Sequence, residues 1–154
     1  LEQSRLRGFL ESSATALDKV DLVSQLDVCA QTISLQWGID VALKSEEPAI
    51  QTDIGMSFNI EHLLREVVTN AVRHAKSKSL TVTLSLKHEV LMMTVSEERQ
   101  PFQDAQVHAK PALTLKSASL RDRLRLLNGE AYVEGLGKGA LLSIRIPMQQ
   151  IEND

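Results

Sequence analysis

The stretch from residue 60 to residue 75 constrains the fold more than any other part of the sequence. Its apolar residues recur at the i, i+3, i+4 spacing of a helix with one buried face. They are Ile60, Leu63, Leu64, Val67, Val68, Ala71, Val72 and Ala75. At about 100° per residue they fill one half of the helical wheel. We therefore expect a long amphipathic helix at the centre of the domain.

Three polar residues, Glu66, Asn70 and Arg73, fall together in a narrow stripe at one margin of the apolar half. His62 lies further round, and His74 lies on the other side of Asn70. Glu66 and Asn70 are spaced i, i+4, so a carboxylate and a carboxamide point the same way one turn apart. Such a pair can hold a hydrated Mg²⁺ through the amide oxygen and a water through the carboxylate.

These residues resemble the N-box of the GHKL ATPase superfamily, in the form found in sensor histidine kinases of the nitrate-sensor and thermosensor class. The matching motif is Arg65-Glu66-x-x-x-Asn70-x-x-Arg73-His74-Ala75. The resemblance implies that Glu66 polarises the attacking group and that Asn70 coordinates Mg²⁺ bound to ATP. It also implies that Arg73 and His74 lie near the phosphates. The spacing of Glu66 and Asn70 alone is equally typical of an ordinary helix with a polar edge, and the residues that follow favour the family.

Composition excludes several classes of function. The chain has 154 residues, enough for one domain with a sizeable core. Its 17 Lys and Arg against 20 Asp and Glu give a net charge of −3, and only 3% of residues are aromatic, so nothing favours nucleic acid as a partner. The single cysteine, Cys29, lies in an apolar helical pattern and is expected to be buried. The four histidines show no zinc-ligand spacing.

The chain begins at Leu1 rather than Met, so we expect a fragment of a longer protein. No apolar run approaches the roughly 20 residues of a membrane span. We expect a cytoplasmic domain, which a membrane-bound parent could carry. Residues 1–16 are expected to be a linker or the tail of a preceding helical domain, residues 17–148 the ATP-binding domain, and residues 149–154 a polar tail.

The order of patterns predicts an α+β sandwich, in which a mixed sheet has helices on one face. The expected elements are a helix from Asp18 or Asp21 to about Trp37, a strand at 39–43, a short strand near Ile50, the central helix from Ser57 or Asn59, a hairpin of strands at 80–86 and 90–95, a helix at 117–128, and strands at 130–134 and 140–147. Residues 97–116 are expected to form a long loop. This order is also that of the histidine-kinase ATP-binding domain, the Bergerat or GHKL fold, over roughly residues 20–147.

The first glycine motif of the family departs from its pattern. Relatives carry Asp-x-Gly-x-Gly, whose Asp binds the adenine amino group. Here Glu97 keeps a carboxylate, whereas Arg99 and Pro101 replace the two glycines. Glycine serves positions that need a positive φ or close backbone approach, and neither replacement meets that need well.

The second motif has also lost its glycine. The helix at Leu120-Arg121-Asp122-Arg123 matches the family's Met-Arg-Glu-Arg signature, but Lys116 stands four residues before Leu120 where relatives have Gly. No glycine occurs between Gly55 and Gly129. Lys116 and the free N–H groups at the start of this helix could attract a phosphate. A solvated loop lysine explains Lys116 equally well.

The last glycine motif, which contains Gly137 and Gly139, is partly kept. Relatives have a Thr where Ala140 stands, and its hydroxyl helps to hold the adenine end. Alanine can neither donate nor accept a hydrogen bond. A plain hairpin turn would use Gly137 and Gly139 in the same way.

The resemblance implies a kinase module that binds Mg-ATP and passes the γ-phosphate to a histidine on a separate dimerisation domain, with a response regulator as the next partner. No plausible acceptor histidine precedes His62, so this fragment should not phosphorylate itself, and it is expected to be monomeric. The alternative is a degenerate domain that relays signals or binds proteins with weakened or lost nucleotide binding. A further possibility is another GHKL protein, such as an anti-sigma kinase or a gyrase-type ATPase.

Overall fold

The computed structural model describes residues 19–75, 79–97, 117–136 and 139–148. The elements follow the expected order, with one additional strand at the start. They are β1 (Lys19–Asp21), α2 (Leu22–Trp37), β2 (Asp40–Ser45), β3 (Gln51–Asp53), α3 (Ile54–Ala75), β4 (Ser79–Lys87), β5 (Val90–Glu97), α4 (Ala118–Leu126), β6 (Glu130–Leu136) and β7 (Gly139–Pro147). The expected linker at 1–16, the tail at 149–154 and residues 98–116 of the expected loop lie outside the described residues.

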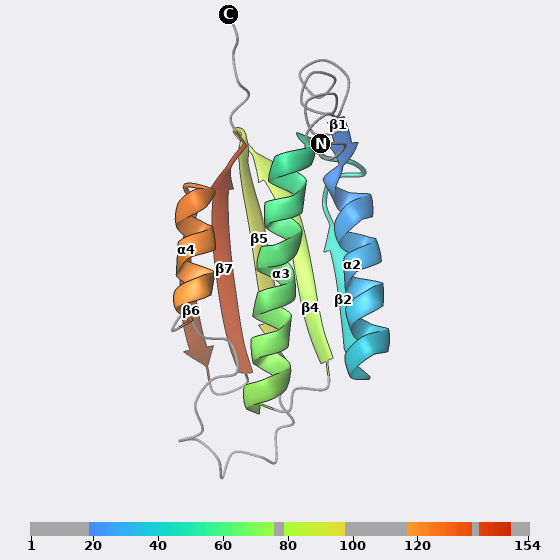
Figure 1. Cartoon of the computed structure of the whole chain (residues 1–154), viewed down its shortest axis with the longest axis vertical. Helices are drawn as coiled ribbons and strands as arrows, with labels where there is room; N and C mark the ends of the chain where they lie inside the picture. The colour runs from blue at the N-terminus through green and yellow to red at the C-terminus, as the bar shows by residue number, and fades with distance from the viewer. Residues whose placement is uncertain (1–18, 76–78, 98–116, 137–138, 149–154) are drawn as a thin grey trace, which may run out of the picture.

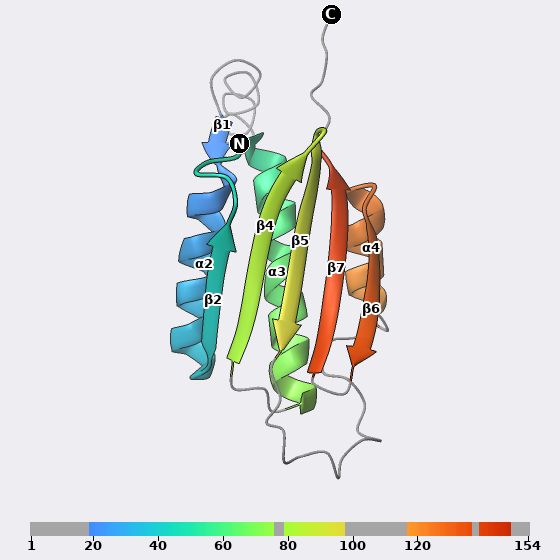
Figure 2. The same cartoon turned by 180° about the vertical axis from the view of Figure 1, so that it is seen from behind.

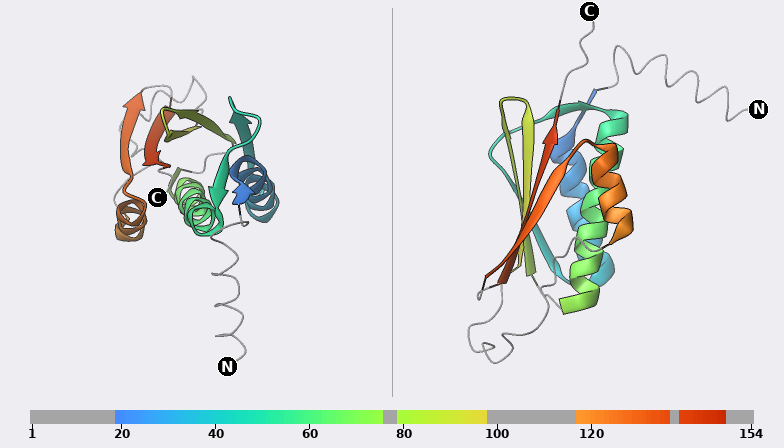
Figure 3. Two further views of the ribbon diagram at one scale, coloured as in Figure 1. Left: turned by 90° about the horizontal axis from the view of Figure 1, so that it is seen from above. Right: turned by 90° about the vertical axis from the view of Figure 1, so that its left-hand side faces the viewer.

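Five strands form a mixed sheet in the order β2-β4-β5-β7-β6. The β2–β4 pair is parallel, with β3 and α3 forming the crossover between the two strands, and the other pairs in this sheet are antiparallel. All three helices cover one face of this sheet, as the two side views and the view from above show (Figures 1 to 3). No helix of the described residues lies on the other face (Figure 2). The predicted α+β sandwich is confirmed.

Helix α3 runs down the middle of the helical layer, between α2 and α4 (Figure 1). The apolar half of α3 predicted from the sequence is buried, from Ile60 to Ala71. It packs on alternate residues of the central strands, all of which are fully buried: Leu80, Val82, Leu84, Leu91, Met93, Val95, Leu142, Ile144 and Ile146. A strand side chain that points to the other face is only partly buried, as period-two alternation requires. One continuous core therefore holds the helices on the sheet.

Of the two caps predicted for the first helix, Asp18 and Asp21, the structure uses Asp21. Asp21 is the N-cap of α2, and its side chain accepts a hydrogen bond from the Val23 N–H. Gly38 ends the helix in the left-handed conformation, with φ 68°. The expected start of the central helix at Ser57 or Asn59 is wrong by several residues. Helix α3 begins at Ile54, where Asp53 accepts a hydrogen bond from the Met56 N–H at 2.8 Å.

Strand β1 was not predicted from the sequence. It pairs antiparallel with β3, with Lys19 opposite Asp53 and Asp21 opposite Gln51. The Leu22 N–H also donates to the Ile50 carbonyl at 2.8 Å. Three residues are too few for a period-two pattern to show, so this strand had no signal of its own.

The predicted turn between β4 and β5 is a two-residue hairpin loop. Both loop residues, His88 and Glu89, have positive φ, of 52° and 63°. Lys87 pairs with Val90 directly across the loop. Positive φ at both central residues is the mark of a type I′ turn, whose twist suits a hairpin.

The end of α4 differs in one detail from the expected stop at Gly129. Asn128 has the positive φ, 55°, and its N–H donates to the Arg125 carbonyl. The Gly129 N–H donates to the Leu124 carbonyl at 2.8 Å, which completes a Schellman motif. Gly129 is needed for close approach instead, because a Cβ there would lie 3.1 Å from the Arg145 carbonyl oxygen.

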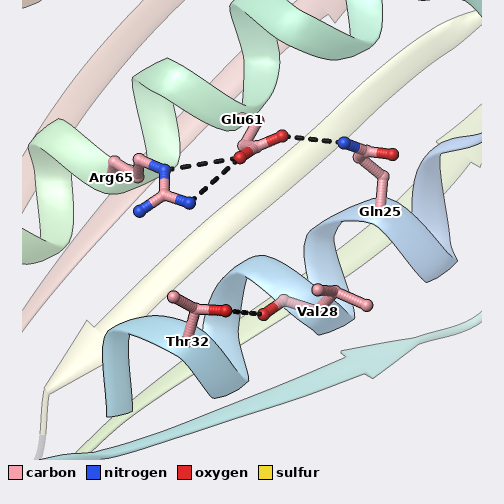
Figure 4. Close-up of polar contacts among 5 residues, drawn as sticks. All are labelled: Gln25, Val28, Thr32, Glu61 and Arg65. Carbon is pink, nitrogen blue, oxygen red and sulfur yellow. Dashed lines mark hydrogen bonds and ion pairs between the residues drawn. The ribbon is translucent and has the colours of Figure 1, made fainter. Parts of the chain in front are cut away.

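Polar contacts tie α3 to α2 on one side (Figure 4). Glu61 accepts a hydrogen bond from the Gln25 side chain at 2.8 Å and pairs with Arg65, one turn further along α3, at 3.2 Å. Thr32 bonds back to the Val28 carbonyl within α2. The Gln25–Glu61 hydrogen bond thus joins the two helices, whereas the other two contacts lie within one helix each.

Candidate functional site

The predicted site residues that are described come to one end of the sandwich. The sheet register requires this: Glu97 at the end of β5 lies opposite Leu80 near the start of β4, and Ser96 lies opposite Leu141 near the start of β7. The C-terminal end of α3 lies at the same end, as do the end of β6 and the start of β7 (Figures 1 and 2). Chain segments more than 60 residues apart therefore surround one region.

Glu66 and Asn70 are half-buried on α3, one helical turn apart, as the sequence predicted. Arg73 is exposed, three residues further along the same helix. His74 lies in the last turn of α3, and its side chain is outside the described part of the structure. The stripe of polar residues thus follows the side of α3 from its middle to its C-terminal end.

The Glu66 carboxylate is held by the start of α4. The Ser117 hydroxyl donates to Oε2 at 2.9 Å, and the Ser119 hydroxyl donates to Oε1 at 3.0 Å. Ser117 is also the N-cap of α4, since its Oγ accepts from the Leu120 N–H at 3.2 Å. Helix α4 has no acidic residue in its own first turn. Glu66 therefore places a negative charge from another element beside the positive end of the α4 dipole.

Glu97 carries a buried carboxylate. Its side chain is 4% exposed, on the helix-covered face of β5, in line with Leu91, Met93 and Val95. Burial of a carboxylate is costly, so such a position is uncommon without a structural or functional reason. The family motif singled out Glu97 as a candidate site residue, and the structure adds that its side chain faces the helical layer of the sandwich.

A second contact joins α3 to α4, and the sequence did not predict it. The Arg123 guanidinium donates to Asn59 Oδ1 at 3.4 Å. The Nε of Arg123 is buried and has no hydrogen-bond partner among the described residues. Arg123 belongs to the Leu-Arg-Asp-Arg signature, which was the only signal that could have pointed to it. The contact helps to fix α4 along the side of α3.

Three predicted site residues are described incompletely or not at all. Lys116 and Gly137 lie outside the described residues. Gly139 is described only as the first residue of β7, paired with Leu136 at the end of β6. Arg99 and Pro101, which replace glycines of the first motif, also lie outside.

The described residues supply few protein ligands for a metal ion at this end of the sandwich. No group of three or more His, Cys, Asp or Glu that could hold a metal ion occurs within the described ranges. Mg²⁺ keeps several waters and is usually bound through one or two protein groups together with substrate phosphates. Asn70 offers one amide oxygen, and Glu66 has further lone pairs beyond those used by the two serines.

The fold is an α+β sandwich. Its candidate site combines a polar stripe on the central helix α3 with a buried carboxylate, that of Glu97, at the end of β5. No protein-family model matches the chain. The solved ATP-binding domain of PrrB from Mycobacterium tuberculosis has the same fold, with a TM-score of 0.65 and 20% identity over 86% of this chain and 98% of that domain. The chain therefore has the fold of a histidine-kinase ATP-binding domain.

Two further similarities are to histidine kinases. The chain is 26% identical to the sensor histidine kinase LiaS of Bacillus subtilis over 119 residues, and these residues make up 77% of this chain. It spans 30% of the length of that kinase. A solved complex of the histidine kinase ThkA with the response regulator protein TrrA is similar in fold, with a TM-score of 0.59 and 14% identity over 96% of this chain and 48% of that one. Among the helices described, none is long and apolar enough to cross a membrane.

Proposed function

We propose that this chain is the ATP-binding and catalytic domain of a two-component sensor histidine kinase of the nitrate-sensor and thermosensor class. The observation that carries the proposal is the placement of Glu66 and Asn70 one turn apart and half-buried on α3, at the end of the sandwich where Glu97 is buried. The likeness to LiaS and to the solved kinase domains supports it.

In the proposed reaction a histidine of a separate dimerisation domain attacks the γ-phosphorus of ATP through one ring nitrogen. The bond from that phosphorus to the β,γ-bridging oxygen breaks, and ADP leaves. Glu66 accepts the hydrogen bond of the other ring N–H and takes its proton as the phosphohistidine forms. A response regulator would then receive the phosphoryl group.

The remaining residues would bind the nucleotide. Glu97 would accept a hydrogen bond from the adenine amino group, and Arg73, His74 and Lys116 would lie near the phosphates. Asn70 would hold Mg²⁺, which supplies charge neutralisation to the phosphates. Gly137 and Gly139 would shape the turn beside the base. The substitutions at 99, 101 and 140 remove favourable contacts, each costing about 1 kcal/mol, so we expect weak binding.

A second candidate function is a degenerate domain that relays signals without binding nucleotide. The observation that favours it is that both Glu66 carboxylate oxygens already accept hydrogen bonds from α4. In that case Glu66 would hold two helices together and have no chemical role.

Calorimetric titration with Mg-ATP distinguishes the two functions. The kinase proposal predicts measurable binding to the full chain that Asn70→Ala and Asn70→Asp abolish. Glu61→Gln is the matched control, because Glu61 lies on the α2 side of the same helix; it should leave the affinity unchanged. An absence of heat and of any thermal shift at millimolar Mg-ATP would contradict the kinase proposal and leave the degenerate domain.

A further inference from the structure

The contact between α3 and the start of α4 controls the orientation of the Glu66 carboxylate. The last torsion of a glutamate side chain is broad and roughly two-fold when nothing holds it. Here each oxygen accepts a separate hydroxyl hydrogen bond, from Ser117 at 2.9 Å and from Ser119 at 3.0 Å. Turning the carboxylate out of this plane would break both hydrogen bonds, so the two serines fix the plane in which the carboxylate lies.

The direction of these hydrogen bonds is fixed as well. The Ser117 Oγ accepts from the Leu120 N–H, so its own proton is available for Glu66. The negative charge also lies at the positive end of the α4 dipole, in a first turn that has no acidic residue of its own. Three favourable terms therefore act in the same direction and keep Glu66 on the α4 side.

We propose that Ser117 and Ser119 are positioning residues for Glu66, which they hold in the orientation that proton transfer requires beside Asn70. This inference rests on the proposed function, because it gives Glu66 the role of proton acceptor. Each carboxylate oxygen keeps a further lone pair after the serine bond is made. The N–H of an acceptor imidazole, or the O–H of a water in its place, can therefore still reach Glu66.

A prearranged acceptor lowers the barrier because no reorganisation is needed when the proton moves. Loss of one of the two serine hydroxyls would leave only one carboxylate oxygen held, so the carboxylate plane could turn about the remaining hydrogen bond while its charge stays in place. We therefore expect the turnover rate to suffer and nucleotide binding to be unaffected.

Ser119 is the residue to change, since Ser117 also caps α4. The reaction to measure is Mg-ATP hydrolysis by the full chain, in which a water oxygen attacks the γ-phosphorus, the bond to the bridging oxygen breaks, ADP leaves and Glu66 takes the water proton. We expect Ser119→Ala to lower kcat roughly 3- to 10-fold with KM unchanged. Ser119→Thr, which keeps the hydroxyl, should restore it.

Ser24→Ala is the matched control. Ser24 donates to the Asp21 carboxylate at 2.8 Å in the first turn of α2, so it loses the same kind of hydrogen bond away from the site. It should lower stability to a similar extent as Ser119→Ala and leave kcat and KM as in the unchanged protein. Equal losses of kcat in both variants would overturn the positioning role.

A double-mutant cycle in urea tests the contact without nucleotide. Glu66→Gln and Ser119→Ala should be coupled by roughly 5-fold in the unfolding equilibrium constant. Additive effects, or a kcat in Ser119→Ala that equals or exceeds that of the unchanged protein, would overturn the inference while Mg-ATP binding still supports the proposed function. Coupling in a chain that binds no Mg-ATP would overturn both and leave a purely structural contact.

Discussion

The carboxylate of Asp21 accepts a hydrogen bond from the backbone N–H of Ile50 at 2.9 Å. The same oxygen accepts from the Val23 N–H at 3.1 Å, and the other oxygen accepts from the Ser24 hydroxyl at 2.8 Å. One side chain therefore caps α2 and also holds the chain just before β3. This joins the small β1–β3 pair to the first helix of the sandwich.

Replacement of Asp21 should be costly for this reason. We expect Asp21→Ala to lower the free energy of unfolding by about 1–3 kcal/mol, since it removes a helix cap and a backbone partner together. Urea unfolding followed by circular dichroism measures the change. Asp27→Ala is the control, because Asp27 is exposed and accepts one hydrogen bond, from Gln31. Equal losses in the two variants would contradict the role assigned to Asp21.

The same carboxylate should make stability depend on acid pH. Burial raises the pKa of Asp21, but the hydrogen bonds from Ile50, Ser24 and Val23 outweigh it, so the pKa lies below the ordinary value of 3.8. The unfolded chain thus binds this proton more readily. The stabilisation that the Asp21 carboxylate provides is complete at pH values above its ordinary pKa of 3.8. It is lost as the pH falls below 3.8 and through the lower pKa of the folded state. Asp21→Asn should reduce the slope of stability against pH in that range.

The hairpin between β4 and β5 offers a stabilising change. His88 and Glu89 both have positive φ, and the sequence Asn-Gly is the preferred choice for such a loop. The double variant His88→Asn and Glu89→Gly should raise the free energy of unfolding by about 1 kcal/mol, after the entropic cost of glycine. Thermal unfolding measures it. His88→Ala alone should give no gain, and a double variant of unchanged or lower stability would show that the loop is not strained.

Two neighbouring substitutions at the end of α4 should have opposite effects. Asn128 has the positive φ, so Asn128→Gly should stabilise by about 0.5 kcal/mol. Gly129→Ala should destabilise by about 1–2 kcal/mol, because its Cβ would meet the Arg145 carbonyl of β7 at 3.1 Å. Chemical denaturation of the two variants provides the comparison. The reverse order of effects would place the left-handed residue at Gly129.

Cys29 should be protected from thiol reagents. Burial raises the pKa of this thiol to about 11. The negative charge of Glu61 adds to this rise, and the positive charge of Arg65 opposes it. At pH 8 the fraction of Cys29 present as thiolate is about 100-fold smaller than it would be for a thiol with the ordinary pKa of 9.0. A chromogenic disulfide should therefore react slowly with the folded chain and quickly in urea. Between pH 9 and about 11 the folded state holds the proton that the unfolded state loses, so Cys29 lowers stability as pH rises there. Fast labelling of the folded chain would contradict this burial.

The central helix and the sheet were predictable because their signals are local. The apolar residues from Ile60 to Ala71 repeat often enough to identify a buried helical face, and strands β4 and β5 alternate over their whole length. Glu66, Asn70 and Glu97 were placed by their spacing and by the family motif. Asp53 was missed as the start of α3 because Ser57 and Asn59 are equally good cap types, and only tertiary structure shows that Ser57 is buried.

The contacts between helices were beyond the reach of the sequence. Ser117 and Ser119 are 51 and 53 residues from Glu66, and Arg123 is 64 residues from Asn59. No periodicity links positions so far apart. The run Ser117-Ala118-Ser119 marked the start of a helix and the Leu-Arg-Asp-Arg signature marked Arg123, but neither gave a partner on α3.

Strand β7 lies between β5 and β6, although it follows both in the sequence. Without β7, strand β6 would have no neighbour in the sheet and β5 would keep one open edge. A folding intermediate that lacks β7 would expose these edges, and an exposed strand edge invites pairing with other chains. Protection of the sheet from edge-to-edge aggregation therefore depends on the insertion of β7 between two strands that precede it in the sequence.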